Sequence, residues 1–482
     1  MSASHILSVH GDRHEPRHNR HAGHHHLIMG KKPAPAPAPT PTPSPAPAPA
    51  PAPVPTNAPL TLSQSTVNGV AQLRVIGTAG DDTITVAQSG QTYTLTNGTW
   101  STTITGSFQS LYIDAANGNN SIVLGPSVVT NAILRGGSGN DTLVGGNASD
   151  AFYAGGGINQ LTGGTGADLF VAIGSTGDTV KGGGGNDSFW LDAGTSEVVT
   201  DLTAAQSTSG VLHRVGSFLG FNAGGTVTAV SKDLLGQNLL DPIADYAYTN
   251  YAADPLFSAA GPGENDVAQG QVGDCYFLAT LSSIAKLDPN LIRQSEVDLG
   301  DGTYAVQFGS GSSKTFVRVD ADLPTFTGGG LAYANLGQDH SLWVAIMEKA
   351  FASYRYSSSS AAYASISSGW MTEVYTDLGC SATDLSALSA SDLLSQTSSA
   401  LTGGKSVTYG CASSPAGSNL VAGHAYTVDH ISYDVYGNAQ IVLRNPWGFD
   451  GYTCNDGSND GYVTVTLAQF YAASMGIVTA IV

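Results

Sequence analysis

Three residues of the C-terminal half could together perform nucleophilic chemistry: Cys275, His424 and Asn445. Two glycines and an aspartate precede Cys275, and a predicted helix over residues 276–286 follows it. A thiol at a helix N-terminus faces backbone N–H groups, which favour the thiolate over the thiol. A buried cysteine at the start of a helix is nevertheless common, so the prediction depends on the histidine and the asparagine as well.

The histidine and the asparagine lie in segments that suit supporting roles. His424 stands in the strand-like segment Gly423-His-Ala-Tyr-Thr-Val428, and Asn445 stands in Leu443-Arg-Asn-Pro-Trp-Gly448. Papain-like nucleophilic sites use cysteine, histidine and asparagine in this order. The pattern therefore predicts Cys275 as the nucleophile, His424 as the general base and Asn445 as the group that orients the base.

The segments around these residues resemble the three catalytic segments of the calpain family of cysteine proteases. They are Gln269-Gly-Gln-Val-Gly-Asp-Cys-Tyr-Phe-Leu-Ala279, Gly423-His-Ala-Tyr426 and Arg444-Asn-Pro-Trp-Gly448. Residues 317–324 and 342–351 resemble a strand and a helix of the same family, so that the resemblance extends over about residues 255–482.

The resemblance implies an α+β papain-like core at residues 240–482, made of two subdomains. The helical subdomain, about 240–400, would carry Cys275, and the β-rich subdomain, about 401–482, would carry His424 and Asn445. The implied activity is that of an endopeptidase that cleaves protein or peptide substrates through a thioester at Cys275.

The resemblance also assigns roles to two further residues. Gln269 matches the side chain that completes the oxyanion hole together with the backbone N–H of Cys275, and Trp447 matches the tryptophan that shields the histidine–asparagine contact from water. Each has a local alternative, since Gln269 could cap a turn and Trp447 could be an ordinary core residue. Glu348 and Lys349, on the helix after Trp343, are assigned to solubility or packing.

Calpain-like cores often bind calcium in each subdomain, and here the implied ligand sets are incomplete. Gly261 and Asp266 match two ligand positions of the first site, but no glutamate is found near residues 363–366. Asp460 matches one ligand of the second site, whereas Tyr462 stands where the family has glutamate. Calcium control of the core is therefore not expected from these residues.

A nine-residue pattern recurs between residues 136 and 190. Units begin at Gly136, Gly145, Gly163 and Gly182, and weaker copies lie at residues 77–85 and 117–124. The acidic position is occupied by Asp141, Asp150, Asp168, Asp178 and Asp187, with Asn159 in the remaining slot. The apolar position is occupied by Leu143, Phe152, Leu161, Phe170, Val180 and Phe189.

These units resemble the nonapeptide of repeats-in-toxin proteins, which implies a parallel β-roll that binds calcium. Glycines allow the tight turns, one carboxylate per unit supplies a hard oxygen ligand, and the apolar residues form short strands that must stack on one another. We predict a β-roll with its cap at residues 57–230 and calcium ligands at the five aspartates. A calcium-free β-solenoid is the alternative, because Asn159 and Ala148 depart from the pattern.

The amino-acid composition argues against several other classes of function. Asp and Glu outnumber Lys and Arg by 37 to 18, which argues against a nucleic-acid partner and leaves room for cations. The four cysteines have no spacing typical of a disulfide framework or a zinc site.

The N-terminal residues predict no packed domain. Residues 1–31 contain eight of the twelve histidines and are expected to form a disordered leader, and residues 32–56, nearly pure Pro-Ala, are expected to form an extended linker. No apolar run is long enough for a membrane span or a signal peptide, so secretion or surface display would use a non-classical route, with a cytoplasmic location as the alternative.

Two rival functions remain open. A transglutaminase-like acyl transferase also uses cysteine and histidine, although its third residue is usually aspartate. A catalytically inert surface or adhesion protein could use the roll for binding alone.

Overall fold

The computed structural model describes residues 59–482 except residues 68, 209, 224, 237, 357–361, 386–388, 453, 455 and 456. The predicted leader and linker lie outside the described residues. All of the described residues belong to one compact unit.

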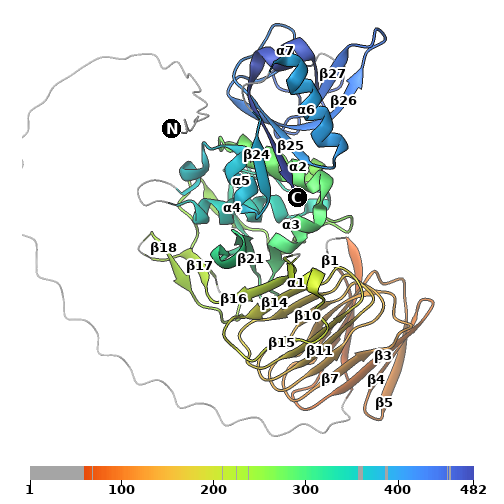
Figure 1. Ribbon diagram of the computed structural model, residues 1–482. Coiled ribbons are helices and arrows are strands. Elements are labelled where there is room, and N and C mark those ends of the chain that lie inside the picture. The colour runs from red at the N-terminus through yellow and green to blue at the C-terminus, as the bar shows by residue number, and fades with distance from the viewer. Residues whose placement is uncertain are drawn as a thin grey trace, which may run out of the picture. The chain divides into compact units, whose positions relative to one another are not determined.

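Residues 61–215 form a parallel β-solenoid of two facing sheets, which confirms the predicted β-roll (Figure 1). The first sheet contains, in spatial order, β1 (Thr61–Val67), β2 (Val70–Ile76), β6 (Ser110–Asp114), β8 (Asn131–Arg135), β10 (Ala151–Tyr153), β12 (Leu169–Ala172), β14 (Ser188–Asp192) and β16 (Leu212–Val215). The second contains β15 (Val198–Val199), β13 (Thr179–Gly183), β11 (Gln160–Gly164), β9 (Thr142–Val144), β7 (Ser121–Leu124), β3 (Thr83–Ser89), β4 (Thr92–Asn97) and β5 (Trp100–Thr105). The pairs β1–β2, β3–β4 and β4–β5 are antiparallel, and the other pairs described in these two sheets are parallel.

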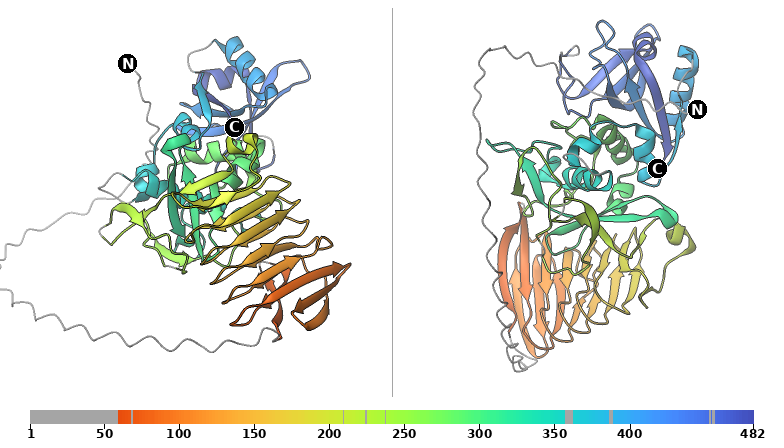
Figure 2. Two further views of the ribbon diagram at one scale, coloured as in Figure 1. Left: turned by 60° about the horizontal axis from the view of Figure 1, so that its bottom comes forward. Right: turned by 90° about the vertical axis from the view of Figure 1, so that its left-hand side faces the viewer.

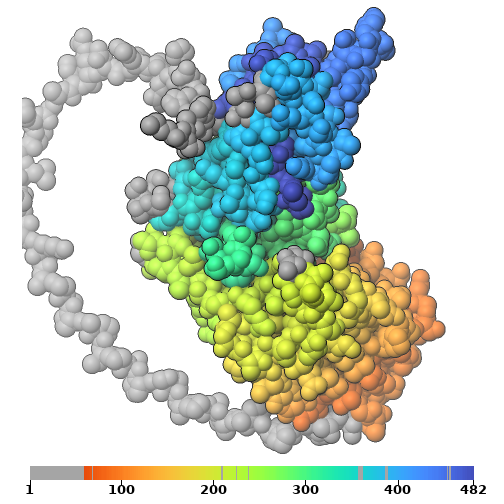
Figure 3. All heavy atoms as spheres, in the orientation of Figure 1, coloured from red at the N-terminus to blue at the C-terminus, as the bar shows by residue number. Residues whose placement is uncertain are grey.

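The nonapeptide period explains this architecture. Successive units alternate between the two sheets, so that Phe152, Phe170 and Phe189 occupy equivalent positions in neighbouring strands. Their rings stack at centroid distances of 4.7 and 5.2 Å inside the roll. From β6 onward the turns therefore follow one another along the roll in sequence order, which agrees with the change of colour from orange to yellow-green in the space-filling view (Figure 3).

The chain leaves the roll through a strand pair that joins the next domain. Helix α1 (Ala204–Thr208) precedes β16, and β17 (Phe218–Phe221) and β18 (Val227–Val230) then enter a five-stranded sheet with β22 (Thr315–Asp320), β21 (Thr303–Phe308) and β20 (Glu296–Asp298). One apolar cluster contains Val171 and Trp190 of the roll together with Val297 of β20. The predicted roll range of 57–230 therefore contains two strands that belong to the sheet of the following domain.

Helices surround the nucleophile segment. They are α2 (Cys275–Leu287), α3 (Pro289–Ser295), α4 (Trp343–Tyr354) and α5 (Met371–Asp377), accompanied by the short 3₁₀ helices Glu264–Asp266, Gly311–Ser313, Gln338–His340 and Ala362–Ile366 and by the strand pair β19 (Ala247–Asn250) and β23 (Asp322–Thr325). Residues 275–285 of α2 are all buried, and Phe277 stacks on Phe351 of α4 at 4.1 Å. The mostly apolar sequences of α2 and α4 therefore form the centre of this subdomain.

The C-terminal region is a six-stranded antiparallel sheet with two helices (Figure 2). Its order is β24 (Ser381–Asp384), β29 (Ser474–Ile481), β25 (Ser406–Cys411), β26 (His424–Tyr433), β27 (Ala439–Arg444) and β28 (Tyr462–Thr466), and its helices are α6 (Ala390–Thr402) and α7 (Leu467–Ala473). The α+β fold class predicted for residues 240–482 is confirmed for the described residues. None of the helices in the described ranges is long and apolar enough to cross a bilayer.

Candidate active site and calcium-binding repeats

Cys275 is the first residue of α2 and is buried, with 1% of its surface exposed. The backbone N–H of Ala425, the residue after His424, lies beside the thiol and favours its ionised form. Thr427 Oγ1 donates to the carbonyl oxygen of Ala279 at 2.8 Å, which fastens β26 to the first turns of α2. The start of β26 therefore lies against the N-terminus of the nucleophile helix.

The β26–β27 hairpin brings His424 and Asn445 together. His424 opens β26, Asn445 follows the last residue of β27, and the two strands pair antiparallel. Asn445 Oδ1 lies 2.8 Å from His424 Nε2 and accepts the backbone N–H of Trp447 at 3.0 Å, while Asn445 Nδ2 donates to the carbonyl oxygen of Asp450 at 3.2 Å. Because Oδ1 can only accept, Nε2 carries the ring proton, and Nδ1 is left as the acceptor.

Trp447 covers the histidine. Its ring centroid lies 4.8 Å from that of His424, at an interplanar angle of 49°. Phe449 and Tyr452 extend the aromatic surface at 5.4 and 5.7 Å from Trp447. This placement agrees with a side chain that excludes water from the buried contact between His424 and Asn445.

In this structure the side-chain amide N–H groups of Gln269 are already engaged in hydrogen bonds and are not free to face Cys275. Its Nε2 donates to the carbonyl oxygen of Val272 at 2.6 Å and to Asp274 Oδ1 at 3.1 Å, and its Oε1 is buried without a partner. Its backbone N–H donates to the carbonyl oxygen of Pro446 at 2.8 Å, which ties the segment to the Asn445 loop. An oxyanion role would require the side-chain amide to turn away from Val272 and Asp274.

Burial opposes charge on both Cys275 and His424. It raises the pKa of the Cys275 thiol to about 12 and lowers the pKa of the His424 imidazole to about 4. Only 1% of the surface of His424 is exposed. The thiolate expected from the helix N-terminus is therefore not favoured in this closed arrangement, because desolvation outweighs the backbone N–H groups.

A pair of buried carboxyl groups beside the nucleophile was missed in the sequence. Asp274, which precedes Cys275, and Glu348 of α4 are both buried, and burial raises both pKa values, that of Asp274 to about 7. The charge of each group opposes ionisation of the other, and Glu348 also accepts the backbone N–H of Ala334 at 3.1 Å. A glutamate inside the apolar run 343–351 was the signal, since a charge in such a run must find a partner.

Lys349, the next residue in the same apolar run, is also a buried charge that has found partners. Its ammonium is buried and donates to Asp241 at 2.5 Å and to Asp320 at 2.7 Å. It thus stands among Asp241, Asp320 and Asp322, whose oxygens lie close enough to one another to hold a metal ion. Lys349 serves as the counter-ion of this acidic cluster.

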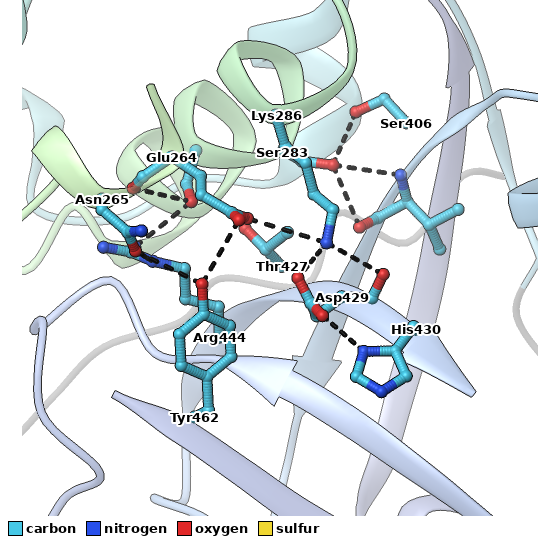
Figure 4. A network of polar contacts seen from close by, with 12 residues as sticks. Glu264, Asn265, Ser283, Lys286, Ser406, Thr427, Asp429, His430, Arg444 and Tyr462 are labelled. Atoms are coloured by element: carbon cyan, nitrogen blue, oxygen red, sulfur yellow. Dashed lines mark hydrogen bonds and ion pairs between the residues drawn. The ribbon is translucent and has the colours of Figure 1, made fainter. Parts of the chain in front are cut away.

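A polar network joins the two halves of the protease region (Figure 4). Lys286 of α2 pairs with Asp429 of β26 and lies 3.8 Å from Glu264, and the Tyr462 hydroxyl donates to Glu264 at 3.3 Å. On another side of α2, Ser283 Oγ contacts Ser406 Oγ of β25 at 2.7 Å. Ion pairs and hydrogen bonds therefore link α2 and residues 264–266 to the β-rich subdomain.

Arg444 is the most buried cation of this network. The residue is 3% exposed, and its guanidinium donates to three acceptors on the helical side. They are Asn265 Oδ1 at 3.2 Å, Ser282 Oγ at 3.2 Å and the carbonyl oxygen of Val267 at 3.0 Å.

We expect Arg444→Met to lower the free energy of unfolding by about 2 to 4 kcal/mol, because it leaves buried acceptors without donors. The comparison variant is Arg355→Met, since Arg355 pairs with the half-exposed Glu373 and donates to only one protein hydroxyl, that of Tyr276 at 3.0 Å, so its loss should be smaller, about 1 to 2 kcal/mol. Thermal unfolding of the two variants measures the difference. Equal losses would show that Arg444 is not a principal tie between the subdomains.

The residues that match calcium ligands in calpain-like cores are engaged with protein donors here. Asp266 accepts the backbone N–H groups of Gln338 and Gly263 and the indole N–H of Trp343, all at 2.8 to 2.9 Å. Gly261 has a φ of +82°, and the guanidinium of Arg293 lies against it. Asp460 Oδ1 accepts the backbone N–H of Tyr462 at 3.1 Å.

The five predicted roll ligands form a buried ladder. Each accepts at Oδ1 a backbone N–H from the preceding turn, at 2.6 to 3.0 Å: Asp141 from Asn120, Asp150 from Ala132, Asp168 from Asp150, Asp178 from Asn159 and Asp187 from Asp168. Asn159 continues the ladder by accepting the backbone N–H of Asp141 at 2.8 Å. The asparagine therefore replaces an aspartate without interrupting the hydrogen bonds between turns.

The second carboxylate oxygen distinguishes the five aspartates. In Asp150, Asp168 and Asp178 it accepts a hydrogen bond from Gly146, Gly164 or Ser175. In Asp141 and Asp187 it is buried without any partner. Burial raises the pKa values of Asp141 and Asp187 to about 6. Hard oxygen donors of this kind fit calcium, which would offset the cost of burying the carboxylates.

Glycine turns bring further oxygens to the same side of the roll. Gly139 has a φ of +123°, and a Cβ there would lie 2.0 Å from the carbonyl oxygen of Gly118 in the neighbouring turn. Only glycine allows turns to stack this closely. Backbone carbonyls and the free oxygens of Asp141 and Asp187 are the groups that would hold calcium.

Comparison with known proteins assigns both regions. Residues 247–460 match the family described as calpain family cysteine protease, and residues 130–161, 153–172 and 173–196 match the RTX calcium-binding nonapeptide repeat. The calpain-1 catalytic subunit of Mus musculus is 30% identical over 219 residues, which is 42% of this chain and 30% of that protein. The calpain-2 catalytic subunit of Gallus gallus is 29% identical over 219 residues, again 42% of this chain and 30% of that protein.

A plant relative gives the same assignment. The calpain-type cysteine protease DEK1 of Zea mays is 29% identical over 213 residues, which is 41% of this chain and 9% of that protein. The chain spans less than a third of the length of these relatives. The chain thus carries a calpain-family cysteine protease domain preceded by RTX calcium-binding nonapeptide repeats.

Proposed function

We propose that the chain is a cysteine endopeptidase whose catalytic residues are Cys275, His424 and Asn445. The observation that carries the proposal is the buried contact of 2.8 Å between His424 Nε2 and Asn445 Oδ1, at a point where the start of β26 lies against Cys275. This contact leaves Nδ1 of His424 as the acceptor for the thiol proton.

The reaction would proceed in two stages. The thiol of Cys275 gives its proton to His424 while sulfur attacks the carbonyl carbon of the scissile peptide bond, and the oxyanion is held by the backbone N–H of Cys275 and by Gln269 once its amide has turned. The imidazolium then protonates the leaving amine, and a thioester remains. Water, deprotonated by the same imidazole, releases the acid product and restores the thiol.

Substrate access requires a more open arrangement than this one. Cys275 and His424 are both buried, and neither lines the cavities beside α3, beside Lys286 or beside Glu296. A small separation of α2 from β26 would admit the peptide and hydrate the site. Hydration removes the desolvation that now opposes the thiolate and the imidazolium.

We assign calcium to the roll rather than to the catalytic subdomains. In the core, Lys286, Arg444 and Tyr462 already link the subdomains. In the roll, Asp141 and Asp187 have free buried oxygens. Roll sites of this kind suit extracellular calcium concentrations, so we infer that the enzyme acts outside the cell.

Labelling with an epoxide that traps reactive thiolates tests the proposal. We expect one label per chain, at Cys275 in the peptide map, together with cleavage of casein. Labelling of Cys380, Cys411 or Cys454 instead would contradict it. Incorporation of amines into casein without cleavage would indicate the acyl transferase, and an unlabelled protein would indicate the inert alternative.

A further inference from the structure

A small cavity lies where the last turns of the roll meet α3 and β20 of the protease domain. Its volume is about 170 Å³. Asp168 and Asn186 line it from the roll, and Asn290, Glu296 and Asp298 line it from the protease side. Glu296 belongs neither to the predicted catalytic residues nor to the predicted ligands of the roll.

The carboxyl group of Glu296 is buried without a hydrogen-bond partner that would offset its loss of hydration. Its side chain is 1% exposed, and neither of its carboxylate oxygens has a hydrogen-bond partner. Burial raises its pKa well above the usual range. A buried carboxyl group in this condition needs either a proton or a cation.

The cationic side chain that lines the cavity does not meet this need. Arg293 also lines the cavity, but its guanidinium lies over the ring of Phe257, 5.8 Å from the centroid, and against Gly261. Neither oxygen of Glu296 accepts a hydrogen bond from it.

The other polar groups around the cavity are oxygen donors. Asp298 supplies a second carboxylate from the same face of β20, with one oxygen accepting the backbone N–H of Gly300 at 2.7 Å. Asn186 of the roll and Asn290 of α3 line the cavity from opposite sides, and the side-chain amide of each contains an oxygen that can serve as a ligand. Calcium binds six to eight oxygen ligands in flexible geometry and can complete its shell with water. A cavity of this volume has room for the ion and several waters, each of which occupies about 30 Å³ in the liquid.

We propose that this cavity is a calcium site shared by the roll and the protease domain, with Glu296 as its ligand from the protease. The site would fix the Asp168 and Asn186 turns of the roll against α3. A direct contact already exists there, since Gln294 Nε2 donates to the carbonyl oxygen of Asp187 at 3.2 Å. Calcium at this position would therefore stabilise the junction between the roll and the protease domain, away from the contacts between α2 and the β-rich subdomain.

Counting bound calcium in the full chain tests the proposal. We expect Glu296→Gln to bind one equivalent fewer than the wild type in equilibrium dialysis, with the aspartate ladder of the roll unchanged. Asp298→Asn should lose the same equivalent. Glu348→Gln is the matched control for binding, because Glu348 is a buried carboxyl group with a raised pKa outside the cavity, and it should keep the wild-type count.

Each outcome decides the question. If Glu296→Gln and Asp298→Asn bind as many equivalents as the wild type, Glu296 simply keeps its proton and the proposal is wrong. If Glu296→Gln fails to fold by circular dichroism, Asp298→Asn gives the answer alone. Magnesium in place of calcium should leave the additional equivalent unfilled, since Mg²⁺ demands a tighter octahedral shell.

Discussion

Cys275→Ala is expected to reduce casein cleavage by at least about a thousandfold while leaving the fold intact, because it removes the sulfur that forms the thioester. The cysteine is buried at the start of a helix, and alanine fits the same space with little change in packing. Circular dichroism and thermal unfolding establish that the variant is folded, and the rate of peptide release measures the loss.

The matched control is another free cysteine of the same domain. Cys380 is half-buried and lies after α5, outside the proposed site, so Cys380→Ala should cleave casein at the wild-type rate. Substantial activity in Cys275→Ala, or a comparable loss in Cys380→Ala, would contradict the assignment of Cys275 as the nucleophile.

Substitution of His424 or Asn445 should reduce activity less than Cys275→Ala does, and the two losses should differ from each other. His424→Ala deletes the base, whereas Asn445→Ala leaves the imidazole in place and removes only the acceptor that fixes its tautomer. We therefore expect the loss of kcat in Asn445→Ala to be smaller than in His424→Ala. The reverse order would mean that these two roles have been exchanged.

The elements that present the site could be predicted from local patterns. The apolar face after Cys275 indicated α2, the segment after His424 indicated β26, and the nine-residue period indicated the roll. Such patterns are visible because helices and strands place apolar residues at fixed intervals.

What escaped prediction depends on pairings between distant segments. Nothing near Glu264 in the sequence indicates that Lys286 and Tyr462 meet it, and nothing near Asp274 indicates Glu348. The C-terminal boundary of the roll was likewise missed, because it depends on the pairing of β17 with β22, almost a hundred residues later in the sequence. The thiolate was expected from a helix start alone, and burial by the other subdomain reverses that expectation.

Calcium should raise the thermal stability of the chain through the roll, but it should not change the rate of casein cleavage. We expect millimolar calcium to raise the melting temperature of the full chain, because the roll would bind the ion only when folded. A site filled at about 100 times its Kd adds about 2.7 kcal/mol, which corresponds to roughly 5 to 10 °C for a domain of this size. Casein cleavage in the presence of chelator should persist, since Lys286, Arg444 and Tyr462 join the two subdomains through direct ion pairs and hydrogen bonds.

The full chain is the right material for this experiment. A cut between residues 230 and 240 would remove β17 from its partner β22 and would expose the apolar cluster that Trp190 shares with Val297. Fragments would therefore confound the loss of calcium with the loss of a shared core.

Aspartates of the roll supply the matched comparison. Asp141→Asn and Asp187→Asn alter the two carboxylates that have a free buried oxygen, whereas Asp150→Asn alters one whose oxygens are both engaged with backbone N–H groups. Asparagine already serves the ladder at position 159, so all three variants should fold. The calcium-induced rise in melting temperature should shrink more in the first two variants than in the third. An undiminished rise in all three would place the ion elsewhere, and activity that disappears in chelator would mean that the subdomain network depends on calcium after all.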